Sequence, residues 1–142
     1  MQYVKTSEGF ILRLLRGEEL FTELLAFAKK ENITAGILHG IGAMSDIEVG
    51  YYDLATKEYS FKKLTEPLEV VSMTGNVAVV DNEPFFHIHA VFSDPELKCY
   101  GGHVKRGTVH VTLEIYLQPY STRVVRELDE NVGLKLCTFP DA

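Results

Sequence analysis

The spacing of apolar residues predicts one helix near the start of the chain. Residues 10–15 have the apolar character of a short strand, and residues 18–31 then carry apolar side chains three or four positions apart. That spacing puts the apolar side chains on one face of a helix. The segment begins with two glutamates and ends with two lysines. Negative charge near the start of a helix and positive charge near its end stabilise the helix dipole.

Beyond residue 31 the pattern becomes the alternation of apolar and polar positions that is typical of strands. We expect strands at residues 35–41, 47–53, 59–64, 68–80, 85–92, 97–103, 108–117, 123–128 and 134–138. The short segments Gly40–Ala43 and Lys105–Gly107 are predicted to be tight turns. One early helix and mainly antiparallel strands indicate an α+β fold, and 142 residues suit a single domain over residues 1–142.

The predicted strand at residues 85–92 has two chemically different faces. Side chains of a strand alternate between its two sides, so His87 and His89 project from the same side. The other side is formed by apolar residues, which we expect to face the core: Phe86, Ile88, Ala90 and Phe92. The two imidazoles therefore point away from the core together.

A third histidine would complete a three-nitrogen site with an open position, the arrangement of a catalytic zinc. Both His103 and His110 are candidates, because a two-residue hairpin loop at Arg106–Gly107 would place them opposite each other. Gly101 and Gly102 permit close approach of a backbone or a ligand, which favours His103. A histidine cluster on the surface or at a subunit interface, without metal, is the alternative.

Other residues have roles that the sequence leaves open. Glu114 is the candidate general base, or the hydrogen-bond partner of a ligating histidine. His39 precedes a glycine pair and is a further candidate for the cluster. Imidazole ligands suit zinc and also other divalent transition metals, so zinc is the first choice rather than the sole one. A metal-bound water would make the protein a metal-dependent hydrolase.

The charge of the chain argues against direct DNA binding. Its formal net charge is −6, whereas a protein that contacts the phosphate backbone carries a basic patch. Apolar runs stay well below the roughly 20 residues of a membrane span. A basic segment followed by an apolar one, typical of a secretory leader, is not present at residues 1–20, so we expect a cytoplasmic protein that does not contact membranes.

Several segments, taken in order, resemble the PPC domain (plants and prokaryotes conserved), which is also the C-terminal domain of the plant AT-hook nuclear-localised proteins. The segments are residues 38–43, 68–75, 87–94, 101–104 and 112–115. The resemblance covers nearly the whole chain, and the ordered set is more specific than any single motif.

The resemblance implies an α+β fold built on an antiparallel sheet, and a homotrimer. Stand-alone prokaryotic members imply a metal site at the residues that match His87, His89 and His103. Kinship with the plant proteins also implies DNA or protein partners. However, the chain has no Arg-Gly-Arg-Pro hook and no basic arm, and the plant members lack the His-x-His pair. The resemblance therefore supports a metal-binding function better than a DNA-binding function.

Overall fold

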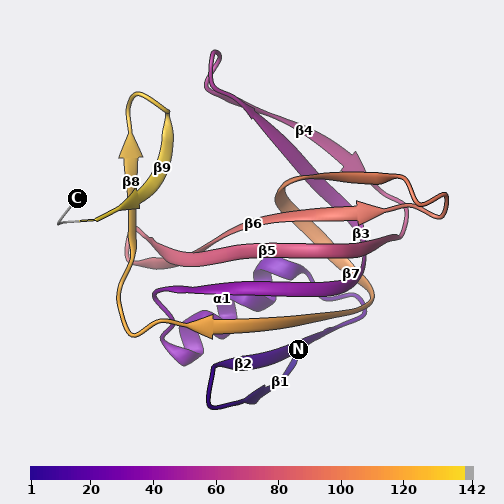
Figure 1. The fold of residues 1–142 in the computed structure, drawn as a ribbon, viewed down its shortest axis with the longest axis horizontal. Coiled ribbons are helices and arrows are strands. Elements are labelled where there is room, and N and C mark those ends of the chain that lie inside the picture. The colour runs from indigo at the N-terminus through magenta and orange to yellow at the C-terminus, as the bar shows by residue number, and fades with distance from the viewer. Residues whose placement is uncertain (140–142) are drawn as a thin grey trace.

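Nine strands and one helix make up the part of the chain that the computed structural model describes, residues 1–139 (Figure 1). The helix α1 is Leu20–Glu31. The strands are β1 Gln2–Lys5, β2 Phe10–Leu15, β3 Gly36–Asp53, β4 Glu58–Leu64, β5 Leu68–Val80, β6 Glu83–Ser93, β7 Cys99–Pro119, β8 Val125–Asp129 and β9 Leu134–Thr138. Most of the structure is antiparallel sheet with a single helix, so the predicted α+β class is confirmed.

The sheet closes on itself through four strands. β3 pairs with β5, β5 with β6, β6 with β7, and β7 returns to β3, all antiparallel. The pair β1–β2 extends the sheet beside β7, and β4 folds back along the outer half of β3 (Figure 1). The one parallel contact among residues 1–139 joins β5 to β8, so the hairpin β8–β9 lies beside the end of β5. Within the same residues, no helix combines the length and apolar composition that crossing a membrane requires.

The helix packs its apolar side against β6 and β7 and closes the core. The carboxylate of Glu19 accepts a hydrogen bond from the backbone N–H of Thr22, which caps the helix start. Asn32 ends the helix in the left-handed conformation, with φ 56°. The buried side chains of the helix are Leu20, Leu24, Phe27 and Ala28. The predicted helix over residues 18–31 is therefore confirmed over Leu20–Glu31, with Glu19 as its N-cap and Glu18 in the loop before it.

The predicted turn at Gly40–Ala43 is wrong. β3 continues through this segment, and its pairing with β5 shifts register between Gly40 and Gly42. Gly42 has φ +153°, and a Cβ placed on it would lie 2.1 Å from the backbone oxygen of Thr112. The glycine therefore serves a bulge and a close strand crossing, not a chain reversal.

The predicted turn at Lys105–Gly107 is also wrong, because β7 is continuous from Cys99 to Pro119. His103 and His110 lie along one strand, so they do not face each other across a hairpin. Between its pairs with Gly42 and Met44, β7 carries more residues than β3, and this bulge breaks the alternation. Val111, which lies in this bulged part of β7, is 62% exposed.

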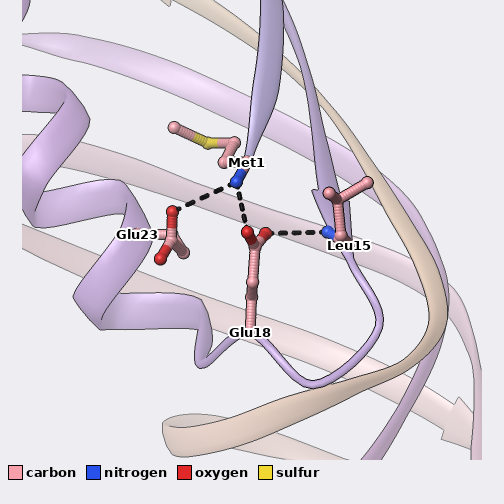
Figure 2. A network of polar contacts seen from close by, with 4 residues as sticks. All are labelled: Met1, Leu15, Glu18 and Glu23. Atoms are coloured by element: carbon pink, nitrogen blue, oxygen red, sulfur yellow. Dashed lines mark hydrogen bonds and ion pairs between the residues drawn. The ribbon is translucent and has the colours of Figure 1, made fainter.

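A polar network ties the start of the chain to the loop before α1 (Figure 2). The Met1 ammonium contacts the carboxylate of Glu18 and lies 3.5 Å from that of Glu23. Glu18 also accepts a hydrogen bond of 2.8 Å from the backbone N–H of Leu15. Burial by itself would raise the pKa of Glu18, but the bonds from Met1 and Leu15 outweigh it and lower the pKa below 4.5.

Replacing Glu18 with glutamine should lower the free energy of unfolding by about 1 kcal/mol at pH 7. Because the folded-state pKa is lowered, the carboxylate stabilises the fold above pH 4.5, and this contribution is lost as pH falls through the folded-state value. Urea unfolding at a series of pH values should show the two proteins converging in acid. A difference that stays constant down to pH 3 would contradict an ionic role for Glu18.

Candidate metal centre

The structure brings His87, His89 and His103 together on the side of the sheet away from the core. His89 and His103 face each other as paired residues of β6 and β7. One nitrogen from each of the three rings lies within 4.8 Å of the other two. The Nε2 atoms of His87 and His89 are 3.2 Å apart. His89 and His103, 14 positions apart in sequence, thus meet through a strand pairing.

The spacing and the donor set fit a metal ion. Two nitrogens bound at 2.0–2.1 Å to one tetrahedral zinc would lie about 3.4 Å apart, close to the separation of the two Nε2 atoms. The Nδ1 atom of His103 is buried without a hydrogen-bond partner among the described residues. An orphaned nitrogen of this kind is expensive unless something binds it. Among residues 1–139, the triad is the group of metal-ligating side chains that meets this geometry.

The environment keeps two of the rings neutral, which leaves lone pairs available for a metal. Burial is the largest cause that lowers the pKa of His87 to about 4, and the positive charge of Arg126 and the other two histidines add to it. Burial also lowers the pKa of His103, with contributions from His89 and Arg126. A neutral ring has one nitrogen without a proton, so His87 offers Nε2 to a metal in the tautomer that carries its proton on Nδ1.

Glycines let the backbones approach closely enough to assemble the triad. A Cβ on Gly102 would lie 2.7 Å from the backbone oxygen of Gly50, and one on Gly101 would lie 2.9 Å from that of Ala90. A Cβ on Gly75 would lie 2.4 Å from the oxygen of His87 itself. Real side chains do not tolerate such contacts, so the expectation of close backbone approach at Gly101 and Gly102 is confirmed.

Three neighbours of the triad were not found from the sequence. The guanidinium of Arg126 lies 3.2 Å from His87 Nδ1 and donates to the Asn76 side chain. The ring of Tyr59 lies 4.9 Å from that of His103, centroid to centroid. These residues come from β8, β5 and β4, and a local pattern in any one strand carries no signal of a partner in another.

The other candidates lie outside the triad. Across the sheet, His89 pairs with Thr74, Thr74 with His39, and His39 with Tyr116. Along this path Tyr116 is three strand spacings of about 4.8 Å from His89, and Glu114 lies two residues further along β7 and is not among the side chains that converge at the triad. His39 is exposed in the same row, and His110 lies on the bulged part of β7. Within one chain, none of these side chains is placed to touch an ion held by the triad.

Solved structures of other proteins share this fold over almost the whole chain. A metal-containing protein from Archaeoglobus fulgidus is 36% identical with a TM-score of 0.87, and 97% of each chain is covered. A PPC protein from Pyrococcus horikoshii is 35% identical with a TM-score of 0.85, covering 91% of this chain and 90% of that one. A candidate DNA-binding protein from Bacteroides thetaiotaomicron is 25% identical with a TM-score of 0.93, covering 97% and 96%.

The curated sequence relatives are longer proteins that match this chain over a small part of their length. The chain is 32% identical over 108 residues to the bifunctional protein GlmU of Synechococcus sp. strain JA-3-3Ab, covering 75% of this chain. That match covers 16% of GlmU, so the chain spans about one sixth of the length of the curated relatives it matches. The model of the Plants and Prokaryotes Conserved (PCC) domain matches residues 1–121. The chain therefore belongs to the Plants and Prokaryotes Conserved domain family, the PPC family that its sequence motifs resemble.

Proposed function

We propose that this protein binds a divalent transition metal, with zinc as the first choice, through His87, His89 and His103. The observation that carries the proposal is the convergence of three ring nitrogens within 4.8 Å. The similar Archaeoglobus protein, which contains metal, supports the same function. When bound there, the ion would supply a Lewis acid with a coordination position open to a further ligand.

Strand pairing and ring packing hold the three histidines in place. His89 and His103 are held by the pairing of their strands, and His87 projects from the same side of β6 as His89. Tyr59 packs on the ring of His103, so that ring has little freedom to turn away. A preorganised set of ligands loses little entropy when the metal binds.

We also propose that the protein is a homotrimer that buries an exposed apolar patch. The patch is formed by Ile41, Val71, Val91 and Val111, whose side chains are 57%, 53%, 40% and 62% exposed. Ile41 sits opposite the bulge that contains Val71, and the residue next to Val71 pairs with Val91. Contiguous apolar surface on a sheet face is typical of an interface.

Elemental analysis of the purified protein, combined with its mass in solution, tests both proposals. We expect about one zinc per chain and a mass of about 48 kDa, three times the 16.0 kDa of one chain. Purification should avoid chelators, because they remove bound metal. Metal-free protein would contradict the site, and a 16.0 kDa species would contradict the trimer.

Two other functions have less support. Candidate DNA-binding proteins are among the similar structures, but the net charge of −6 opposes attraction to a phosphate backbone. Hydrolysis with Glu114 as general base would require a carboxylate beside the triad, and Glu114 is not among the side chains that converge there. Metal binding is the function that the geometry supports best.

A further inference from the structure

A buried arginine, Arg126, contacts the triad at His87 and comes from the hairpin β8–β9. Arg126 belongs to β8, beyond residue 121 where the family match ends. It is only 8% exposed. One of its nitrogens, Nη2, donates to the Asn76 Oδ1 at 2.9 Å and lies 3.2 Å from His87 Nδ1, while Nη1 donates to the backbone oxygen of Lys135 at 3.0 Å.

The charge of Arg126 is not balanced by a carboxylate. The ion pairs of residues 1–139 involve other groups, and its Nε is buried without a hydrogen-bond partner in the described chain. Buried charges in proteins are normally paired with an opposite charge. The neutral oxygens of Asn76 and Lys135 satisfy hydrogen bonds but leave the positive charge in place.

Arg126 faces His87 with a hydrogen-bond donor, at the place where a metal-bound histidine normally faces an acceptor. A metal-bound histidine normally gives its second N–H to a carboxylate or a carbonyl oxygen, which adds negative character to the site. A guanidinium can only donate, so it cannot accept the Nδ1–H that His87 carries when its Nε2 binds the ion. The surroundings therefore add positive charge where most metal sites add negative charge.

We propose that Arg126 makes the metal centre selective for an anionic ligand, a carboxylate or phosphate oxyanion, at the open coordination position. This inference rests on the proposed metal site. A divalent ion, three imidazoles and the guanidinium together carry an excess of positive charge that an oxyanion offsets. A neutral ligand gains nothing from that charge, and burial protects the attraction from screening by salt.

Ligand titrations of the cobalt-loaded protein test this inference through the visible absorption of the ion. Acetate and acetamide have nearly the same size and shape but differ in charge, and we expect wild-type protein to prefer acetate by about tenfold or more. Phosphate serves as the second oxyanion and imidazole as the neutral ligand. In Arg126→Gln, affinity for both oxyanions should fall by about tenfold, with affinity for imidazole unchanged.

The controls separate charge from fold and from metal content. Arg126→Lys keeps the positive charge and should retain most of the preference for acetate. Arg123→Gln is the matched control, because Arg123 precedes the same hairpin, is exposed and bonds Asn82 rather than the triad. It should bind acetate as wild type does. Cobalt per chain is measured for every variant before titration.

Each outcome bears on a different step. Equal affinity of wild-type protein for acetate and acetamide would overturn the selectivity, even if Arg126→Gln failed to fold. Equal acetate affinity in wild type and Arg126→Gln, with one cobalt per chain in both, would overturn the role of Arg126 and leave the metal site standing. A wild-type chain that takes up no cobalt would overturn the metal site and the inference together.

Discussion

Replacing His87 and His89 together with alanine should abolish metal binding while the fold persists. The variant retains one of the three converging nitrogens. Changing even the outer partners of metal ligands costs 10–100-fold in affinity, so losing two ligands should cost on the order of 1000-fold or more. Zinc per chain, measured after dialysis against buffer without chelator, should fall from about one to less than about 0.1.

The fold should persist because both side chains point away from the core. His89 is exposed and His87 half-buried, whereas Ile88 between them is fully buried. Substitution of the exposed His89 should change stability by about 0.5 kcal/mol or less, and removing the half-buried His87 ring beside Arg126 should cost about 1 kcal/mol. The midpoint of thermal unfolding without metal should therefore fall by only about 2–4 °C, and the mass in solution should match that of wild type.

A second pair of histidines gives a matched control. His39 and His110 also lie on strands and are absent from the triad. A His39→Ala/His110→Ala variant should keep about one zinc per chain. If the control lost zinc as completely as the first variant, the ion would be bound through scattered histidines and the proposed site would be wrong.

Local alternation was enough to predict which histidines share a face. The apolar side of β6 is buried as expected, from Phe86 at 3% exposed to Phe92 at 0%. The periodicity of a strand is a property of consecutive residues, so a single sequence reveals it. The same holds for α1, whose apolar spacing, acidic start and basic end all lie within one short segment.

Contacts between distant strands were not predictable in this way. Gly42 marks a bulge because it crosses Thr112, 70 positions later in the chain, and a glycine that ends a strand has the same local sequence signal. His103 meets His89 through the pairing of β6 and β7, whereas the hairpin expected from the sequence would have placed His103 opposite His110. Arg126 reaches Asn76 over a separation of 50 residues, so its isolated position in an alternating segment gave no sign of a partner.

Gly42 provides the largest expected effect on stability. Gly42→Ala would place a Cβ 2.1 Å from the backbone oxygen of Thr112, at φ +153°. Two paired strands would have to separate, and strain of this kind costs about 1–3 kcal/mol before any lost pairing is counted. We expect a loss of about 3 kcal/mol or more in the free energy of unfolding, measured in urea at one fixed protein concentration.

Gly17→Ala separates backbone strain from steric collision. Gly17 also has positive φ, +88°, but a Cβ there would meet nothing within 4 Å. Replacing Gly17 with alanine should therefore lower the free energy of unfolding only by the conformational penalty, about 1 kcal/mol. The excess cost at Gly42 then measures how tightly β3 crosses β7. If the two substitutions destabilised the protein equally, the crossing would be looser than the structure shows, and the continuous β3 with its bulge would have to be abandoned.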